Sequence, residues 1–430
     1  MMDDSYIILV LFGALTTALA LGIPVGFALG IATALGLTLT SIPLVYIAQT
    51  LYTGVGMFPL IAIPGFILTG LLMEKSGLTH KIVKIVTLAV GNVPGGLAVV
   101  TIISCMFFAA LTGSGPATTA AIGGIMIPAM IRAGYSVGFA AAVAATGGAL
   151  GILIPPSNPM IIYGVMANVS VTGLFMAGML PGVLLAAALA GYCVYTGYRR
   201  GYTSAGGAFQ FKPLLKACWD GKAALSMPVV VLGSIYGGFA TPTEASMLAV
   251  VYAAAYGFIT GHSKLADLGN SMVKTATLTG AILIIMGPAM AFGKLITLYD
   301  VPMQVSEYIT SLSSSPLLIL ILISILLIII GTFMETISTI VLLVPVFLPA
   351  LLALGVDPVH FGILFVVLSE VGFLTPPLGV NLYVASAISG QSIESVSKSV
   401  LPFLMILLLF CALLIAVPEI ATIGYSSGAR

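Results

Sequence analysis

The stretch GILIPPSNPMIIYG, residues 151–164, interrupts a long apolar region of the chain. Pro155 and Pro156 lack the backbone N–H that a helix interior requires, so a helix that reaches this point must stop. The carbonyl oxygens of the preceding turn, beginning at Gly151, then lose their intrahelical partners and become candidate ligands for a cation. Ser157 and Asn158 come directly after the break, where they can cap the next half-helix or add side-chain oxygens.

Composition indicates that this break lies within a membrane. The chain has 430 residues, of which 60% are hydrophobic and only 6% charged, and its mean hydropathy is +1.21. A soluble domain carries roughly 25% charged residues. The net charge of +1 gives no basic footprint for nucleic acid. The motifs HExxH, GxGxxG and the P-loop are absent from the sequence, so an enzyme is not expected, and any pumping is ion-driven or depends on a separate ATPase.

The apolar segments and the positive charges together predict a topology of about ten membrane-spanning helices. If the N-terminus lies outside, 12 of the 14 Lys and Arg residues fall on one face, with Lys294 and Arg430 as the exceptions. Cytoplasmic loops collect such charges, so this face is expected to be cytoplasmic and both chain ends periplasmic. The predicted spans are 5–21, 23–40, 54–74, 136–168, 171–198, 224–240, 243–260, 276–298, 358–390 and 400–418. Segments 94–133 and 316–354 are each split by polar residues and read as re-entrant hairpins, although full spans there give the same sidedness.

A second copy of the break reveals an internal repeat. GILIPP at 151–156 aligns with GFLTPP at 372–377, and the same offset of 221 residues carries Pro128 onto Pro349 and Gly134 onto Gly355. Each half contains an odd number of crossings, so the halves are predicted to be inverted, as in many secondary transporters. The expected units are scaffold helices 1–93, a transport half 94–200, a cytoplasmic linker 201–222, scaffold helices 223–315 and a second transport half 316–430.

The breaks and the hairpin tips together supply candidate ion and substrate ligands. The tips, TGSGPATT at 112–119 and METIST at 334–339, are rich in hard oxygen donors, which suit Na⁺ better than thiophilic metals. Half-helices that begin at these points direct positive dipole ends inward and favour an anion without a buried Arg. The candidate sodium ligands are Ser114, Gly115, Thr118, Gly151, Pro155, Asn158, Glu335, Thr336, Ser338, Thr339, Gly372, Thr375 and Gly379. The candidate substrate ligands are Thr112, Ser114, Ser157, Thr336 and Asn381.

Other interpretations of these residues stay open. The small polar clusters are also typical of close helix packing in membranes. Glu335 and Glu370 are membrane-embedded acids, so proton coupling through them competes with sodium coupling. A channel is a third alternative. The three histidines, His80, His262 and His360, are expected in loops.

The motifs GSGPATTAAIGG, GILIPPSNPMIIYG, GGFATPTEAS, METIST and GFLTPPLGVNLY resemble the DctM-type large membrane subunit of tripartite ATP-independent periplasmic (TRAP) transporters over nearly the whole chain. The resemblance implies a multi-pass protein of the bacterial inner membrane that imports organic acid anions by a sodium-driven elevator motion. C4-dicarboxylates, sialic acid and related carboxylates all fit at this level. It also implies two partners, a small four-helix membrane subunit on a separate chain and a periplasmic substrate-binding protein, and no cofactor besides the coupling Na⁺. By the same resemblance, sodium binds between each tip and its broken helix, and substrate binds between the two tips.

Overall fold

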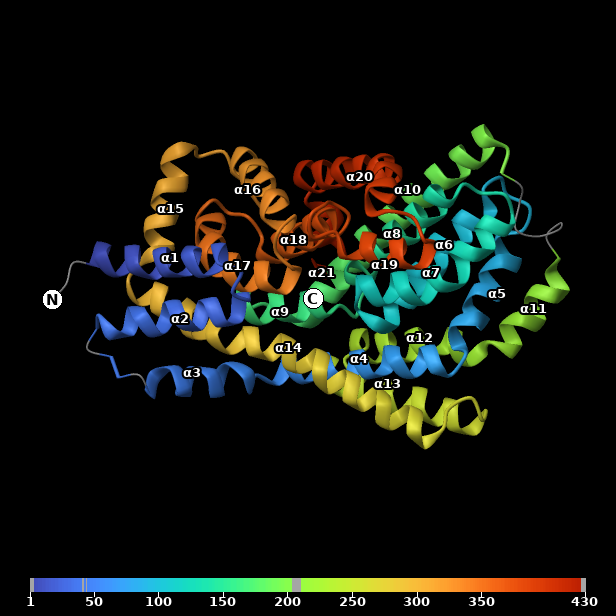
Figure 1. Cartoon of the computed structure of the whole chain (residues 1–430), viewed down its shortest axis with the longest axis horizontal. Coiled ribbons are helices and arrows are strands. Elements are labelled where there is room, and N and C mark those ends of the chain that lie inside the picture. Colours follow the sequence, from blue (N-terminus) through green and yellow to red (C-terminus); the bar gives the residue numbers. More distant parts are fainter. Residues whose placement is uncertain (1–3, 41, 44, 203–209, 427–430) are drawn as a thin grey trace.

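The structure, a computed structural model, describes residues 4–40, 42–43, 45–202 and 210–426, and every regular element in these ranges is a helix (Figure 1). This confirms the predicted all-α membrane fold. The first half contains α1 (Asp4–Ala20), α2 (Val25–Thr38), α3 (Val45–Val55), the 3₁₀ helix η1 (Phe58–Ile61), α4 (Ala62–Lys75), α5 (Leu78–Val90), α6 (Gly96–Thr112), α7 (Gly115–Arg132), α8 (Val137–Leu153), α9 (Asn158–Ala167) and α10 (Val171–Arg200). The second contains α11 (Phe211–Asp220), α12 (Lys222–Tyr236), α13 (Pro242–Ile259), α14 (Leu265–Leu298), α15 (Val301–Leu312), α16 (Pro316–Gly331), α17 (Thr336–Ala353), α18 (Pro358–Phe373), α19 (Val380–Ser389), α20 (Ile393–Ala416) and α21 (Glu419–Ser426).

Several of these helices are long and apolar enough to cross a membrane. Within the described residues, six segments pass both criteria: Phe58–Lys75, Val137–Ala167, Val171–Arg200, Leu265–Leu298, Thr336–Ala353 and Ile393–Ala416. The pair α15 and α16 makes a seventh if it is counted as one span bent by 118°. The remaining predicted spans fall on α1, α2, α12 and α13, and on α18 together with α19. Residues 1–3 and 427–430 at the chain ends, and residues 203–209 of the predicted linker, lie outside the described residues. The sidedness predicted for the two chain ends therefore stays a prediction.

The inverted repeat is visible in the order and placement of the helices. The offset of 221 residues carries the bounds of α7 onto those of α17, and α5, α6, α8, α9 and α10 onto α15, α16, α18, α19 and α20 within a few residues. In Figure 1, α5 lies at one end of the long axis and α15 at the other, as inverted copies require. Both central Pro–Pro peptide bonds, Pro155–Pro156 and Pro376–Pro377, are cis.

The two halves also differ in ways that the sequence reading missed. Repeat 1 has separate helices α3 and α4 where repeat 2 has the single 34-residue helix α14. Helix α11 stands inside the segment predicted as a linker, and the 221-residue offset gives it no counterpart. It packs on α5, and the Lys81 ammonium of α5 donates to the Asp220 carbonyl oxygen at the end of α11, at 3.2 Å.

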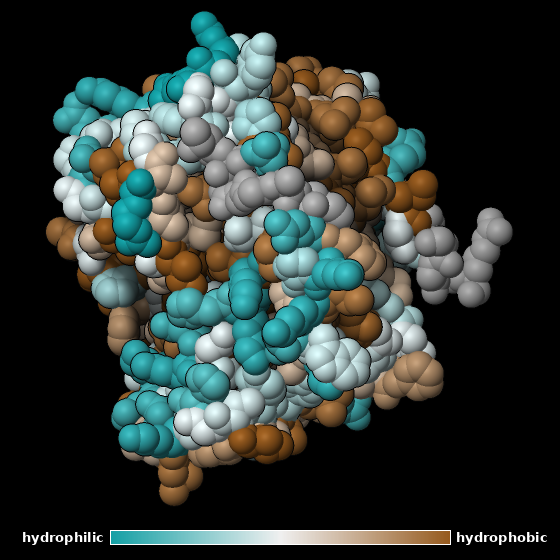
Figure 2. Space-filling view, turned by 90° about the vertical axis from the view of Figure 1, so that its right-hand side faces the viewer, coloured by the Kyte–Doolittle hydropathy of each residue, from teal (hydrophilic) through white to brown (hydrophobic). Residues whose placement is uncertain are grey.

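One end of the molecule is distinctly polar. Figure 2 views the end that carries α5 and α11 and shows hydrophilic side chains gathered there, with hydrophobic surface along its upper right edge. The side chains of Lys75, Arg199 and Arg200 belong to helix ends whose positive charges sequence analysis assigned to the cytoplasm. The placement of these charged helix ends therefore agrees with the sidedness that the charge distribution predicts.

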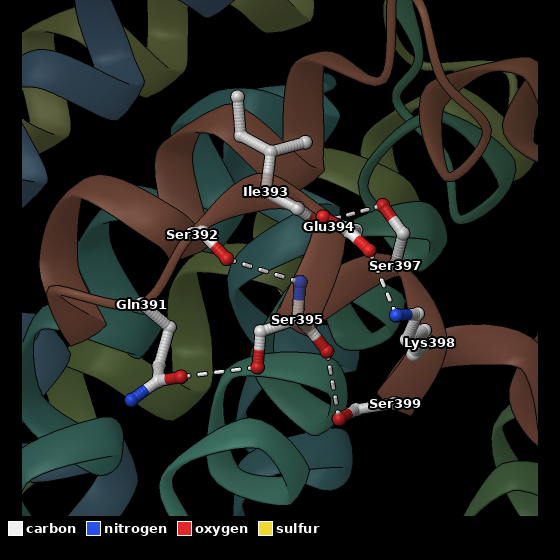
Figure 3. Close-up of polar contacts among 8 residues, drawn as sticks. All are labelled: Gln391, Ser392, Ile393, Glu394, Ser395, Ser397, Lys398 and Ser399. Atoms are coloured by element: carbon white, nitrogen blue, oxygen red, sulfur yellow. Dashed lines mark hydrogen bonds and ion pairs between the residues drawn. The ribbon is translucent and has the colours of Figure 1, made fainter.

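The start of α20 shows how a polar helix end is built (Figure 3). Ser392 is the N-cap, and its hydroxyl accepts the Ser395 amide at 3.3 Å. Glu394 lies in the first turn, where its charge suits the helix dipole, and Lys398 bonds to it at 2.7 Å one turn later. The Gln391 side-chain oxygen accepts the Ser395 hydroxyl at 3.0 Å.

The expectation for the histidines is wrong at two of the three positions. His80 lies in α5, and His360 lies in the first turns of α18 with 2% of its surface exposed. The His360 Nε2 atom is 2.9 Å from the Leu414 carbonyl oxygen of α20. A polar side chain beside a helix start looks like a loop residue from sequence, because only the neighbouring helix supplies the partner that makes burial tolerable.

Candidate functional site

The first hairpin consists of α6 and α7, and its tip is two residues long. Gly113 adopts φ of +58°, a conformation that residues with a side chain rarely tolerate, and Ser114 is extended, so the chain reverses direction. The Thr118 hydroxyl donates to the Ser114 carbonyl oxygen at 2.9 Å, and the hydroxyls of Thr112 and Thr118 are 3.1 Å apart. The tip is therefore held by its own hydroxyl groups.

The second hairpin, α16 and α17, repeats one of these bonds. The Thr339 hydroxyl donates to the Glu335 carbonyl oxygen at 3.0 Å, as Thr118 does to Ser114, the residue 221 positions earlier. Glu335 is the N-cap of α17, and its carboxylate accepts the amides of Ile337 at 3.1 Å and Ser338 at 3.4 Å. Thr339 and Ser338 are both buried.

Each broken helix stops where its prolines require. Helix α8 ends at Leu153 and Ile154 turns to an extended conformation before Pro155. The Ser157 hydroxyl accepts the Met160 amide at 3.4 Å and so caps α9, the capping role that the sequence allowed. In repeat 2, α18 ends at Phe373, and α19 starts after Gly379, whose φ is +37°.

Each hairpin tip packs against the broken helix of its own repeat. In repeat 1, the Asn158 amide donates to the Gly113 carbonyl oxygen at 3.4 Å, and a Cβ atom on Gly151 would lie 2.6 Å from the Ser114 carbonyl oxygen. In repeat 2, the Leu378 amide donates to the Thr332 carbonyl oxygen at 3.0 Å. A Cβ atom on Gly372 would lie 2.7 Å from the Gly331 carbonyl carbon, so backbone meets backbone there too. The structure thus brings together the tips and breaks that sequence analysis paired.

The two repeats are also interlocked. Helix α9, beyond the first break, packs on α17, and α19, beyond the second break, packs on α7. Asn381 of α19 is fully buried, and its Nδ2 atom donates to the Ala145 carbonyl oxygen of α8 at 3.3 Å. A Cβ atom on Gly115 would lie 3.3 Å from the Asn381 Oδ1 atom. Asn381 therefore ties the repeats together behind the first tip.

A cavity of about 520 Å³ lies between the tips and the helices α2, α4 and α14. Six predicted ligands line it: Thr112, Ser114, Gly115, Asn158, Glu335 and Ser338. Ten others do not: Thr118, Gly151, Pro155, Ser157, Thr336, Thr339, Gly372, Thr375, Gly379 and Asn381. Sequence analysis missed Glu74, an exposed residue in the last turn of α4 that also lines the cavity. In the sequence, Glu74 stands next to Lys75 at the end of an apolar segment, and nothing there distinguishes it from an ordinary surface acid.

Some buried polar atoms of the described residues lack a hydrogen-bond partner. They include the Asn158 Oδ1 atom beside the first tip, the Thr336 Oγ1 atom at the second tip and both carboxyl oxygens of Glu370. Asn158 is 5% exposed, Thr336 2% and Glu370 0%. A buried oxygen without a donor is costly, and an oxygen-preferring cation such as Na⁺ would satisfy it. The Asn381 Oδ1 atom, near Gly115 of the first tip, is a further unpartnered oxygen, and the hard oxygen donors at both tips fit such an ion.

The comparisons with known proteins agree on one family. A family model described as "Tripartite ATP-independent periplasmic transporter, DctM component" matches residues 12–420. The isethionate TRAP transporter permease DctMQ of Oleidesulfovibrio alaskensis is 42% identical over 96% of this chain, which spans only 65% of that protein's length. The C4-dicarboxylate large permease DctM of Pseudomonas aeruginosa is 37% identical over 85% of each chain. The sialic acid large permease SiaM of Vibrio cholerae is 34% identical over 93% of each.

Among solved structures, the Alcanivorax borkumensis YdaH transporter resembles this chain with a TM-score of 0.67 and covers 89% of it and 90% of its own length. The sequence identity is 15%, so the likeness concerns the fold alone. Its title describes an unusual topology.

Proposed function

The chain belongs to the DctM family of tripartite ATP-independent periplasmic transporter components, and from this premise we propose that it is the translocation subunit of a sodium-driven importer of an organic acid anion. The observation that carries the proposal is the pairing of each hairpin tip with the broken helix of its own repeat. Non-helical backbone at membrane depth persists only where it is buried in protein, lines a watery cavity or holds a ligand.

Sodium coupling is supported by the chemistry at the tips. The first site would use the Asn158 Oδ1 atom with carbonyl oxygens of residues 113–115 and of the turn around Gly151, and the second would use Thr336 and the turn around Gly372. These oxygens are hard ligands, which suit Na⁺ better than thiophilic metals, and carbonyl and amide oxygens are too weakly basic to take up a proton near neutral pH. The test is uptake into proteoliposomes that contain the protein and its partners. Uptake should collapse when the Na⁺ gradient is removed, and full uptake on a proton gradient alone would contradict the assignment.

The position of the cavity supports an inward-facing state. Its lining includes Pro24 and Val25 at the start of α2, Glu74 at the end of α4 and Leu278 in the first half of α14. The charge topology assigns all four positions to the cytoplasmic half of the membrane. We infer that substrate leaves to the cytoplasm by this route.

The division of contacts supports an elevator motion. Helices α6–α9 and α16–α19 hold each other through the tips and breaks, whereas α1–α4 and α12–α14 form the facing scaffold. The two parts meet closely at Gly70 of α4, where a Cβ atom would lie 3.3 Å from the Thr112 Cβ atom of the first hairpin. This spacing is slightly shorter than the Cβ–Cβ separation of about 3.5–4.5 Å in disulfides, so a small shift of the two helices would accommodate the bond.

Cysteines at this contact test the elevator. In a background without the four native cysteines, Gly70→Cys combined with Thr112→Cys should cross-link on oxidation and stop uptake, and reduction should restore it. The reduced double variant is the matched control for any effect of losing the threonine. Undiminished uptake by fully cross-linked protein would rule out relative movement of these two parts.

Two partners complete the proposal, a small membrane subunit and a periplasmic binding protein that delivers the substrate. The matching family is described as a component of a tripartite transporter, and the name of the relative DctMQ joins the letters M and Q. Reconstitution should give uptake only when all three components are present. Activity of the single chain at the full rate would contradict the partnership.

Glu370 favours proton coupling as a second candidate function. Its side chain is fully buried and both oxygens lack partners in the described part of the chain. An ionised carboxylate without a partner is expensive at such a position, so Glu370 would have to carry a proton. Glu370→Gln should leave uptake unchanged if sodium alone drives transport, and should abolish pH-driven uptake if Glu370 is a proton carrier.

A further inference from the structure

Helix α11 has no counterpart under the 221-residue offset, so the inverted repeat does not account for its presence. Figure 1 places it beside α5 at one end of the long axis, where Figure 2 shows hydrophilic side chains gathered. With 10 residues it is about 15 Å long, about half the thickness of the hydrocarbon core of a bilayer. It cannot cross a membrane, and the surface that it exposes requires another explanation.

One side of α11 is an exposed apolar row. Residues four apart lie on the same side of a helix, and Phe211, Leu215 and Trp219 have this spacing. Their side chains are 66%, 60% and 70% exposed. Another side of the helix is packed on α5: Ala217 is buried, and a Cβ atom on Gly221 would lie 2.6 Å from the Ile85 Cδ1 atom. The apolar row therefore points away from the protein, and three large apolar side chains exposed to water together are unfavourable.

Three lysines lie next to this row. Lys212 and Lys216 form the adjacent row of α11, and the Lys222 Nζ atom, at the start of α12, is 4.1 Å from the centroid of the Trp219 ring. All three side chains are exposed, and among the described residues none of them forms an ion pair. The preceding residues 203–209 contain no Asp or Glu that could neutralise them. The positive charge of this surface is therefore available to a partner outside the chain.

An apolar row beside a basic row is typical of a helix that lies in the membrane interface. The apolar side chains enter the boundary between headgroups and acyl chains, and the lysine stems extend their ammonium groups to the phosphates. Tryptophan prefers this depth, because its ring is apolar and its N–H is polar. A zwitterionic headgroup brings a positive charge of its own, so unpaired lysines favour a headgroup with net negative charge. A free acidic solute would satisfy the lysines but would leave the apolar row in water.

We propose that α11 and the start of α12 form a binding site for an anionic phospholipid at the cytoplasmic surface of the membrane. The Lys81 ammonium of α5 connects this site to the rest of the protein: besides the Asp220 carbonyl oxygen of α11, it donates to the Tyr256 hydroxyl of α13 at 2.5 Å. The bound lipid thus anchors the junction between scaffold helix α13 and α5, the helix that leads into the first hairpin. This membrane contact does not depend on the coupling ion or the substrate.

Trp219 is the only tryptophan of the sequence, so the intrinsic fluorescence of the unaltered protein reports on α11. The full-length chain is reconstituted in phosphatidylcholine bilayers that contain the same mole fraction of one brominated lipid, either phosphatidylglycerol or phosphatidylcholine. Bromine on the acyl chains quenches a tryptophan only at short range, so both lipids should quench Trp219. Brominated phosphatidylglycerol should bind with an apparent constant about five- to thirtyfold higher, the gain from one to two lysines at an anionic surface. High salt should weaken this preference.

Paired substitutions separate the two rows. Lys212→Gln with Lys216→Gln should keep the quenching by brominated phosphatidylcholine and lose most of the preference for phosphatidylglycerol. The matched control is Lys264→Gln with Lys274→Gln at the start of α14, which removes the same charge from exposed positions that sequence analysis assigned to the same face, and it should keep the preference. Phe211→Ser with Leu215→Ser should reduce quenching by both lipids, because the apolar row then no longer holds Trp219 at the acyl boundary.

Equal quenching of the wild-type protein by the two brominated lipids, or no quenching by either, would overturn the anionic lipid site. So would a preference that survives in the Lys212 and Lys216 pair or disappears in the control pair. A tryptophan-free variant of the small membrane subunit tests the other occupant: if its addition abolishes quenching by phosphatidylglycerol, the surface is a protein interface and the lipid site is refuted, whereas persistent quenching supports the lipid. Each negative result would leave sodium-driven uptake, measured in the complete system, unaffected.

Discussion

Gly372→Ala is the sharpest test of the contact between hairpin and broken helix. The new Cβ atom would lie 2.7 Å from the carbonyl carbon and 3.1 Å from the Cα atom of Gly331, and it would press on the carbonyl oxygen as well. Carbon atoms prefer separations of about 3.5–4.0 Å. The hairpin must therefore retreat by about 1 Å, and because its nearest atoms are backbone, no side-chain rotation can absorb the change.

Overpacking of this kind costs about 1–3 kcal/mol of folding free energy. The matched control is Gly124→Ala in α7, where a Cβ atom would meet nothing within 4 Å. There, removal of a helical glycine should stabilise the protein by about 0.5–1 kcal/mol. The two substitutions have the same chemistry but should move the thermal unfolding midpoint in opposite directions.

Function should respond as well, because the misplaced hairpin carries proposed sodium ligands. A displacement of about 1 Å in a binding geometry can cost a hundredfold in rate, so the Na⁺ concentration for half-maximal uptake should rise at least about tenfold in Gly372→Ala. Gly124→Ala should leave it unchanged. If both variants share one midpoint and one Na⁺ dependence, the close contact of Gly372 with Gly331 is not a feature of the working protein.

Three further predictions follow from the same geometry. Thr118→Val and Thr339→Val each remove one hydroxyl bond to a tip carbonyl, at a cost of about 0.5–1.5 kcal/mol in unfolding experiments, and Thr118→Val also removes the contact with the Thr112 hydroxyl, so a larger loss at Thr339 than at Thr118 would contradict the reasoning. Asn381→Ala removes an additional hydrogen bond on the Ala145 carbonyl oxygen, which lies inside α8, and should cost about 0.5–1.5 kcal/mol, whereas anion binding measured on the purified chain should hold because Asn381 lies outside the cavity. Replacement of Na⁺ by choline should lower the thermal midpoint of the wild-type protein, and an unchanged midpoint up to high Na⁺ concentration would count against both tip sites.

The sequence was sufficient for the paired hairpins and broken helices, though not for the division into α3 and α4 or for α11. Paired prolines, the 221-residue offset and the distribution of lysines each act through local or one-dimensional rules, such as the missing amide of Pro155 or the length of an apolar run. For that reason the hairpins, both helix breaks and the pairing of each hairpin with its break can be predicted from the amino-acid sequence alone. The same rules predicted which segments meet, because inverted repeats bring equivalent breaks to one place.

The orientation of individual side chains was beyond such rules. Asn381 reads as a substrate ligand, yet it faces Ala145 of the other repeat, and Glu74 reads as a surface acid, yet it lines the cavity. Both outcomes depend on how helices distant in sequence rotate and pack against each other. Hydropathy does not encode that rotation.

The N-caps of α7 and α17 also show the difference between what the sequence predicts and what the folded structure decides. From sequence, Ser114 and Glu335 are equivalent tip residues, each with an oxygen to offer. Only the folded tips decide that the Glu335 carboxylate turns back onto its own helix amides while the Ser114 hydroxyl does not. The sequence by itself therefore determined where the oxygen donors and helix starts gather, and the tertiary structure decided which helix end stays open, because a hydrogen bond depends on direction and distance as well as on the presence of the atoms.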